Sequence, residues 1–202
     1  MSTGARVVEV HTYPVKSMGA AGLAGADVTP AGLDGDRAWS VIAEDGGVVS
    51  ARTSPGLREV TVVDVGAAPT LDVPGVAARV AGPDADAALS TYIGAPVRLA
   101  RVQGSGQEAA AVHLVSRQAV AAAIGTTSDD PACDIETPRA NVMLDLGDDP
   151  PEGFERAWVG QDVAVGDAVL HVSTVPKHCL GVYAEVVRPG RINLGDSVQP
   201  RG

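Results

Sequence analysis

The sequence predicts a mainly β protein with minor α content, because short apolar runs alternate with turn residues along the whole chain and aromatic side chains are scarce. The 202 residues include 24 Gly and 14 Pro, and only 3% are aromatic. Small branched side chains between such turns are typical of a core built from many short strands. With 45% hydrophobic residues, the chain is long enough for one large domain or two small ones.

Strand patterns dominate roughly the first hundred residues. Residues 6–10 alternate in the strand manner and end at a turn marked by Pro14. Two β-rich runs, 39–43 and 48–52, flank the Gly-rich segment 44–47, which predicts a hairpin. Further strands are expected at 60–65, 70–73 and 76–80, and a helix is expected at 84–93, begun by an acidic cap and ended by Gly94.

The second half opens with a predicted strand at 97–102 and a Gly, Ser and Gln-rich break. This break is the expected boundary between a first domain, residues 1–102, and a second, residues 103–202, which could also pack as one unit. Ser116 is a candidate N-cap for a short Ala-rich helix that ends near Ile124, and the start of such a helix favours anions. The polar stretch 125–137 is expected to be a mobile loop.

Two similar segments near the C-terminus indicate a closed barrel. Residues 163–169 and 192–198 each consist of an apolar run, a Gly-Asp turn and a second apolar run. Such turns suit the rim of a small barrel, whose closure removes exposed sheet edges. We therefore expect a β-barrel of mixed α/β content.

The charge balance argues against nucleic-acid and anionic-membrane partners. A net charge of -10 and a pI near 4.7 leave little clustered positive charge to meet phosphates or anionic head groups. No signal-like segment opens the chain and no apolar stretch is long enough for a membrane span, so a cytoplasmic location is expected. In that reducing compartment both cysteines are expected to be thiols.

A few cations next to turn residues are candidates for holding an anion. Lysine occurs only as Lys16 and Lys177, against 13 arginines, and each lies in a Pro-marked segment. Arg offers a bidentate fork to phosphate and Lys a point charge, so several together would form an anion site. The candidates are Lys16, Arg37, Arg52 and Arg139. The alternative is that each arginine pairs with a local acid, above all Arg37 beside Asp34 and Asp36.

Cys179 is a candidate nucleophile or soft-metal ligand. It follows Lys177 and His178, and neighbouring positive charge favours a thiolate. The alternative is a small buried hydrophobe, the usual role of a free cysteine. Cys133 lies among acids and is the weaker candidate. The sequence has no Gly-x-Ser-x-Gly elbow, no Walker loop and no dinucleotide fingerprint.

Taken in order, these segments resemble the MOSC family, named for the C-terminal part of molybdenum cofactor sulfurases, preceded by its N-terminal β-barrel partner. The motifs that carry the resemblance to the N-terminal partner are residues 13–17, 35–39 and 51–57, and those for the MOSC part are residues 113–116, 138–142, 158–160, 165–167, 175–179, 181–192 and 194–196. The resemblance implies a MOSC β-barrel packed against an N-terminal β-barrel-like domain.

The resemblance also implies a molybdenum cofactor, a pyranopterin (molybdopterin) with a phosphate and a metal-holding dithiolene. Lys16, Ser17 and Arg37 would grip its anionic part, and Ser116, Arg139 and Asn141 would complete the cradle. Cys179 would be the metal ligand and catalytic thiolate. Related reductases act on N-hydroxylated small molecules. A separate electron-transfer partner is then required, because this chain has no flavin, haem or Fe-S motif.

One departure from the family pattern keeps two alternatives open. Family members usually carry a sizeable stretch between the cysteine and the Gly-Val-Tyr-Ala segment, whereas here only Leu180 separates Cys179 from Gly181. Lys177 also stands where an arginine is common. The alternatives are a metal-free MOSC-fold enzyme that acts on a small metabolite, and a non-catalytic carrier of cofactor or sulfur.

Overall fold

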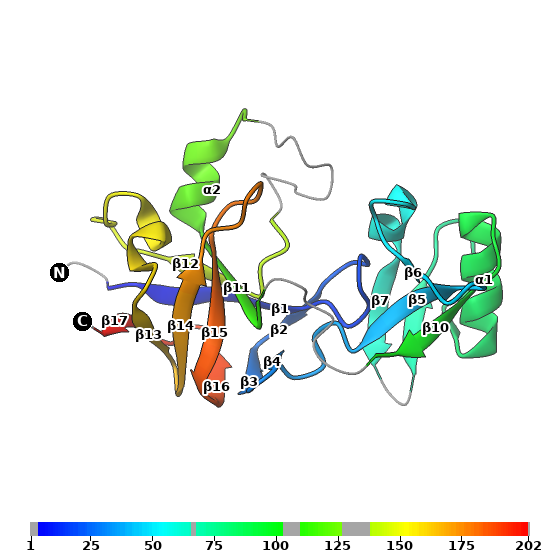
Figure 1. Ribbon diagram of the computed structural model, residues 1–202, viewed down its shortest axis with the longest axis horizontal. Helices are drawn as coiled ribbons and strands as arrows, with labels where there is room; N and C mark the ends of the chain where they lie inside the picture. The colour runs from blue at the N-terminus through cyan, green and yellow to red at the C-terminus, as the bar shows by residue number, and fades with distance from the viewer. Residues whose placement is uncertain (1–3, 66–67, 103–109, 127–137, 202) are drawn as a thin grey trace. The chain divides into compact units, whose positions relative to one another are not determined.

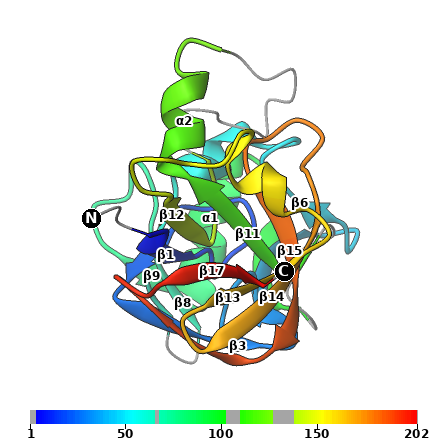
Figure 2. The same ribbon diagram turned by 90° about the vertical axis from the view of Figure 1, so that its left-hand side faces the viewer.

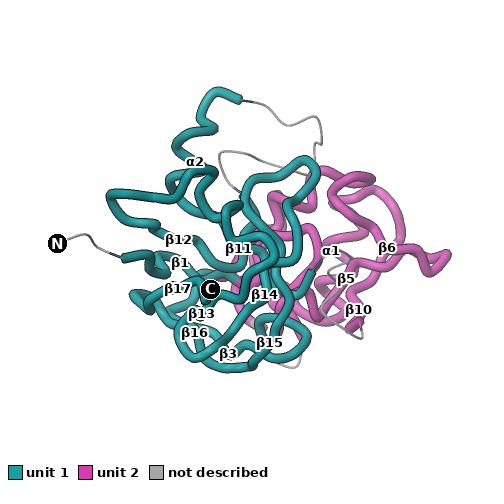
Figure 3. Tube along the Cα trace, turned by 60° about the vertical axis from the view of Figure 1, so that its left-hand side comes forward, with its two compact units in different colours: residues 1–11, 22–34, 107–202 teal, residues 12–21, 35–106 magenta. Residues whose placement is uncertain are grey.

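The computed structural model describes residues 4–65, 68–102, 110–126 and 138–201. They form two compact units (Figure 3), and each is described by itself. Unit 1 contains Met1–His11, Gly22–Asp34 and Gln107–Gly202, and unit 2 contains Thr12–Ala21 and Gly35–Gly106. The boundary expected after residue 102 borders a stretch outside the described residues and stays a prediction, as does the loop expected at 125–137, most of which also lies outside them.

An eight-stranded sheet is the main feature of unit 1 (Figure 1), with the order β17-β13-β14-β15-β11-β12-β1-β2. Its strands are β1 (Arg6–Thr12), β2 (Ala21–Leu23), β11 (Val112–Ser116), β12 (Val142–Asp145), β13 (Asp162–Val165), β14 (Ala168–Thr174), β15 (Val182–Arg188) and β17 (Val198–Arg201). β11 and β12 run parallel, whereas β11 and β15 run antiparallel. All five residues of β11 are buried, which makes it a central strand of the unit.

The sheet curls back on itself. The N–H of Val7 donates to the carbonyl of Asp196 at 2.9 Å, and the N–H of Val198 donates to the carbonyl of Ala5 at 2.8 Å. These bonds join β1 to the segment that enters β17, at the other end of the strand order. Figure 2 looks at this curved arrangement. The mainly β class and the barrel-like fold expected from the sequence are confirmed.

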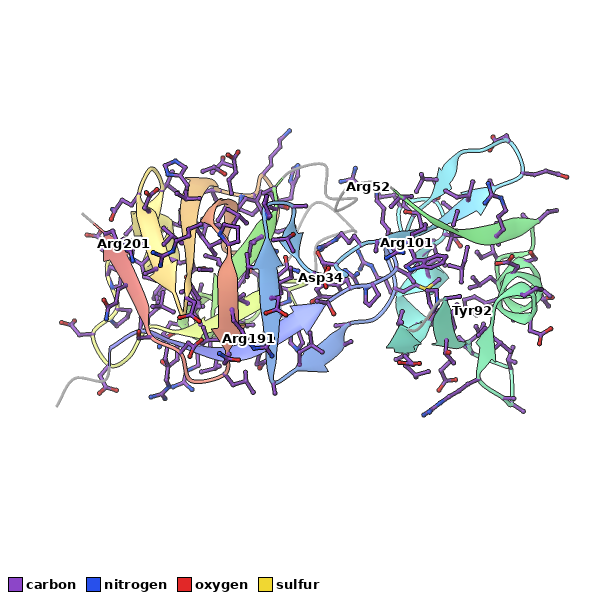
Figure 4. The ribbon with its side chains drawn as sticks, turned by 90° about the horizontal axis from the view of Figure 1, so that it is seen from below. Asp34, Arg52, Tyr92, Arg101, Arg191 and Arg201 are labelled. Carbon is purple, nitrogen blue, oxygen red and sulfur yellow. The ribbon has the colours of Figure 1, made fainter. Side chains whose placement is uncertain are left out.

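Shorter elements complete unit 1. They are the sheet β16-β3-β4, formed by β16 (Gly190–Asn193), β3 (Gly25–Thr29) and β4 (Gly32–Leu33), the helix α2 (Arg117–Ala123) and the 3-10 turn η2 (Phe154–Trp158). Arg191 of β16 pairs with Asp27 of β3 at 3.0 Å (Figure 4). Gly166 and Gly195, in the two predicted Gly-Asp turns, both have left-handed backbone, as such turns require.

Unit 2 has two three-stranded sheets around its own core. They are β10-β5-β6, with β10 (Val97–Arg101), β5 (Trp39–Ala43) and β6 (Val48–Val49), and β7-β8-β9, with β7 (Thr61–Val65), β8 (Pro69–Asp72) and β9 (Val80–Ala81). The helix α1 (Pro83–Ile93) and the 3-10 turn η1 (Pro55–Glu59) accompany them. Met18, Leu57, Leu71 and Leu89 are fully buried in this core.

Three local expectations differ from the structure. The second hairpin strand ends at Val49 because the chain turns at Ser50, whose carbonyl accepts from the N–H of Thr53 at 3.0 Å. The strand expected at 76–80 is reduced to β9, because a turn at 73–76 precedes it. Helix α1 begins at Pro83 with no side-chain cap, since proline already holds the backbone angle that a first helical residue needs. Its expected end at Gly94 is confirmed.

Candidate functional site

Within unit 2, the fold brings Lys16, Ser17 and Arg37 onto two adjoining segments. The N–H of Lys16 donates to the carbonyl of Trp39 at 2.9 Å, and the N–H of Arg37 donates to the carbonyl of Tyr13 at 2.8 Å. Lys16, Ser17 and Arg37 are each half-buried. The two segments are more than twenty residues apart in the sequence, so backbone pairing accounts for their proximity.

Two of these three residues have an unusual backbone. Ser17 has φ 72° and Arg37 has φ 50°, and only one other non-glycine residue of the described chain, Phe154, has a positive φ. A left-handed conformation costs free energy for a residue with a Cβ. It is retained where the surrounding structure enforces it, and such residues cluster at functional sites. At Ser17 the Oγ accepts from the N–H of Ala51 at 2.9 Å, which holds the turn.

Arg37 pairs with a local acid, as the alternative interpretation anticipated. The partner is Asp36, which is 3% exposed; its Oδ2 binds Nη1 of Arg37, and its Oδ1 accepts from the N–H of Tyr13 at 2.7 Å. The guanidinium also lies 5.2 Å from the ring centroid of Tyr13. A guanidinium has five N–H donors, so a pair with one carboxylate oxygen does not by itself exclude an anion.

In unit 1, Ser116 is the N-cap of α2, as predicted. Its Oγ accepts from the N–H of Ala119 at 3.0 Å, and the residue is fully buried. The hydroxyl still has its own proton to donate. Leu114 of β11 pairs with Val182, the first residue of β15, in antiparallel register. Ser116, two residues further along β11, therefore lies beside the chain that precedes Val182. That chain is the connection from β14 to β15, and it carries Cys179. Figures 1 and 2 both show that connection at the α2 end of the sheet.

Asn141 has a structural task in this unit. Its Oδ1 accepts from the N–H of His113 at 3.0 Å, and its Nδ2 donates to the carbonyl of His11 at 3.4 Å. The residue is fully buried. The Asn141 amide therefore ties β11 to β1, which the sequence motif did not reveal.

The remaining cations differ in their surroundings. Arg139 is half-buried, and its carbonyl faces Nδ1 of His113 at 3.4 Å. Arg52 is exposed (Figure 4). Lys177, the second lysine, is also exposed, two residues before Cys179.

Cys179 is half-buried and forms a disulfide bond in this structure. The expectation that both cysteines are thiols is therefore wrong for Cys179. The other cysteine of the chain, Cys133, lies outside the described residues. Because a disulfide sulfur has no thiolate to offer, Cys179 is a metal ligand or nucleophile only after reduction.

Sequence reasoning missed a buried carboxyl group next to the third strained residue. Glu155 in η2 is 0% exposed, and neither of its carboxylate oxygens has a hydrogen-bond partner among the described residues. Phe154, just before it, has φ 56°. η2 packs against β11 and α2. The only signal in the sequence is a glutamate placed between two aromatic residues, Phe154 and Trp158.

A charge network around the buried Asp145 joins β1, β12 and α2. Asp145 pairs with Arg6 at 2.8 Å and with Arg117 at 2.9 Å, and its Oδ1 accepts from Nε2 of Gln118 at 2.8 Å. The Gln118 hydrogen bond is the main cause that lowers the pKa of Asp145, supported by the N–H of Gly147 and the two arginines, while burial opposes the shift. This cluster stabilises the ionised carboxylate.

The described residues contain neither a preformed metal centre nor a membrane-spanning helix. No group of three or more His, Cys, Asp or Glu side chains there is arranged to hold a metal ion. Among the same residues no helix has both the length and the apolar character of a membrane span.

Comparison with known proteins identifies the family. The MOSC N-terminal beta barrel domain family matches residues 4–117, more than half of the 202 residues, and the chain therefore belongs to it. The YuaD protein of Bacillus subtilis has a similar solved structure, with a TM-score of 0.47, 14% sequence identity, and coverage of 98% of this chain and 96% of that one. No curated protein matches the chain.

Proposed function

We propose that this MOSC-family protein binds a molybdenum cofactor and reduces an N-oxygenated small molecule. The observation that carries the proposal is the left-handed backbone of Ser17 and Arg37. The sequence motifs had already selected both residues for binding the anionic part of the cofactor. Of the three candidates Lys16, Ser17 and Arg37, two have a strained backbone. Because strain lowers the stability of the fold, a role in ligand binding explains it better than a role in stabilising the protein.

The chemical types of the candidate side chains suit such a ligand. Lys16, Arg37 and Arg139 supply positive charge, and the hydroxyls of Ser17 and Ser116 can donate to phosphate oxygens. After reduction, Cys179 supplies a soft thiolate suited to molybdenum. When bound, the cofactor would supply the two-electron redox chemistry.

The roles left to the protein are binding, orientation and exclusion of water. Reductive cleavage of an N–O bond consumes two electrons and two protons and releases water. The electrons must come from a separate electron-transfer partner. The small molecule is the substrate, and neither nucleic acid nor a membrane is required.

Elemental analysis tests the proposal most directly. Protein purified reduced from a host that makes the cofactor should contain molybdenum, and its denatured extract should show the fluorescence of oxidised pterin. Absence of both signals would reject the proposal. Cys179→Ala should abolish turnover of an amidoxime or hydroxylamine, and continued turnover would reject the ligand role.

A matched pair of variants tests the cations of unit 2. Lys16→Ala combined with Arg37→Gln should reduce retained molybdenum and pterin, because two of the three candidate cations, both in unit 2, are removed. The control is Arg98→Ala with Arg101→Ala, which removes the same charge from exposed positions of β10. Equal retention in both double variants, with equal melting temperatures, would contradict the anion-binding role.

The disulfide at Cys179 favours a second candidate function, that of a metal-free MOSC-fold protein whose chemistry is that of a thiol. Such a protein would be either an enzyme that acts on a small metabolite or a carrier of sulfur. A persulfide on reduced Cys179 would support the carrier. It would form by transfer of the outer sulfur from a low-molecular-weight persulfide, which leaves as a thiol, and would be detected by intact-protein mass in a Cys133→Ser background. If molybdenum never binds and no persulfide forms, the metal-free enzyme is the candidate that remains.

A further inference from the structure

The chain just after Cys179 is held tightly against β11. Nε2 of His113 lies 2.8 Å from the carbonyl oxygen of Leu180. Since a carbonyl only accepts, Nε2 carries the proton and donates. Gly181 has φ 85°, and a Cβ there would lie 2.2 Å from the carbonyl oxygen of Leu114. The backbone of this connection therefore approaches β11 as closely as only glycine allows.

The other edge of the His113 ring faces the segment that carries Arg139. Nδ1 lies 3.4 Å from the Arg139 carbonyl oxygen. The ring also packs edge-on against Tyr183 with centroids 5.0 Å apart, and the residue is only 5% exposed. With its one N–H on Nε2, the neutral ring has no proton on Nδ1 to donate to the Arg139 carbonyl. The hydrogen bond to Leu180 and the packing against Tyr183 are therefore the interactions that orient the imidazole.

Because the connection is short, the hydrogen bond from His113 to Leu180 also restricts the position of Cys179. Only Leu180 and Gly181 separate the cysteine from the first residue of β15. A residue anchored at Leu180 therefore fixes the position of its neighbour, Cys179, with little slack. A longer connection would allow the cysteine to move even with the anchor in place.

We propose that His113 is a positioning residue that holds the Cys179 connection against β11 through its hydrogen bond to the Leu180 carbonyl. The chemical role of Cys179 rests on the proposed function; the anchoring of its connection does not. His113 is proposed to act through the backbone carbonyl of Leu180 and not on the reacting atoms themselves. The competing interpretation is a histidine that merely fills the buried end of β11.

The test measures how readily reduced Cys179 is alkylated, in a Cys133→Ser background so that one thiol is followed. His113→Phe keeps a ring but removes the donor to Leu180, so iodoacetamide should react about five to ten times faster, the factor expected from losing one hydrogen bond. His113→Gln retains an N–H donor of similar reach and should restore the slow rate. His171→Gln, at a half-exposed histidine of β14, is the control and should change nothing.

If His113→Phe does not fold, His113→Asn replaces it, because asparagine is too short to reach Leu180 and should also react fast. An unchanged rate in the donor-less variant, or an equal rise in His113→Gln, overturns the positioning role. Retention of molybdenum by each variant is measured beside alkylation. If His113→Phe is alkylated fast and the wild-type protein binds no molybdenum, the positioning role is supported while the proposed function is rejected.

Discussion

Ser17, Arg37 and Phe154 have the same uncommon left-handed backbone, and each lies in or beside a group with a special role. Ser17 and Arg37 belong to the candidate anion site, and Phe154 precedes Glu155, whose carboxyl has no hydrogen-bond partner within the described part of the chain. Natural sequences break local rules at a few places, and these are often functional. At the residue scale, strain and an unsatisfied buried group therefore mark the positions where stability has been given up.

Replacing Glu155 with methionine should stabilise the protein. A buried carboxyl without a partner loses its hydration and gains nothing in return, so an apolar side chain of similar shape should raise the free energy of unfolding by about 1–3 kcal/mol. Urea unfolding at neutral pH measures the change. Glu152→Met, at an exposed position, is the control and should stay within about 0.5 kcal/mol. A destabilised Glu155→Met would mean that the carboxyl has a stabilising partner.

Asp145 should make stability depend on pH in the acid range. Its pKa in the folded protein is lowered from the ordinary value of 3.8, so its contribution is complete above that value and is lost as the pH falls through the folded pKa. Asp145→Asn should therefore have a lower free energy of unfolding than the wild type at pH 6. This difference in free energy between the two proteins, the stability gap, should close below about pH 4. Unfolding curves at pH 6, 4 and 3 measure it, with exposed Asp149→Asn as control. A gap that widens on acidification would contradict the assignment.

At the element scale, the connection between β14 and β15 carries the candidate ligand Cys179 and contains both buried and exposed residues. Pro176 is buried, Lys177 and His178 are exposed, and Cys179 is half-buried. Register with β11 places this connection beside Ser116 and the start of α2. The short link noted as a departure from the family pattern thus results in a closely anchored cysteine.

Gly181→Ala should displace the connection between β14 and β15, whereas Gly195→Ala should leave the turn that contains Gly195 in place. Both glycines have nearly the same φ, 85° and 86°, but a Cβ at 181 meets the Leu114 carbonyl, whereas a Cβ at 195 meets nothing within 4 Å. We expect Gly195→Ala to cost about 1 kcal/mol from backbone strain and Gly181→Ala to cost about 2 kcal/mol more from overpacking. Thermal unfolding measures both. Equal losses would show that β11 yields to the added methyl group.

At the scale of the whole molecule, the redox state of Cys179 decides which chemistry is open to the protein. The structure has Cys179 in a disulfide, and a cysteine binds a soft metal as the thiolate, which a disulfide does not offer. The same fold is thus compatible with a reduced, metal-binding form and an oxidised form without that ligand.

Loading with cofactor should therefore require prior reduction. In denaturant, the oxidised protein should give no reaction with a thiol reagent, and the reduced protein should give two thiols, one for each cysteine of the chain. Reduced protein incubated with molybdenum cofactor should retain molybdenum after gel filtration, and oxidised protein should retain much less. Cys133→Ser, which cannot form the disulfide within the chain, should load without reductant. Equal loading of both redox forms would exclude Cys179 as a ligand.

The sequence by itself determined the features that depend on neighbouring residues. The strand at Arg6, the Ser116 cap, the end of helix α1 at Gly94 and the Gly-Asp turns follow from side-chain alternation, capping chemistry and glycine's backbone freedom. The motifs also identified the family, because their order along the chain is specific. These are local properties, and local sequence is sufficient to predict them.

Only the tertiary structure decided which partners these residues have. It pairs Arg37 with Asp36, commits the Asn141 amide to two strands, and buries the Glu155 carboxyl with no hydrogen-bond partner among the described residues. It also anchors Leu180 to His113, a residue 67 positions away. Such contacts arise from chain segments that only folding brings together, and burial then sets the free energy of each polar group. No pattern of neighbouring residues contains that information.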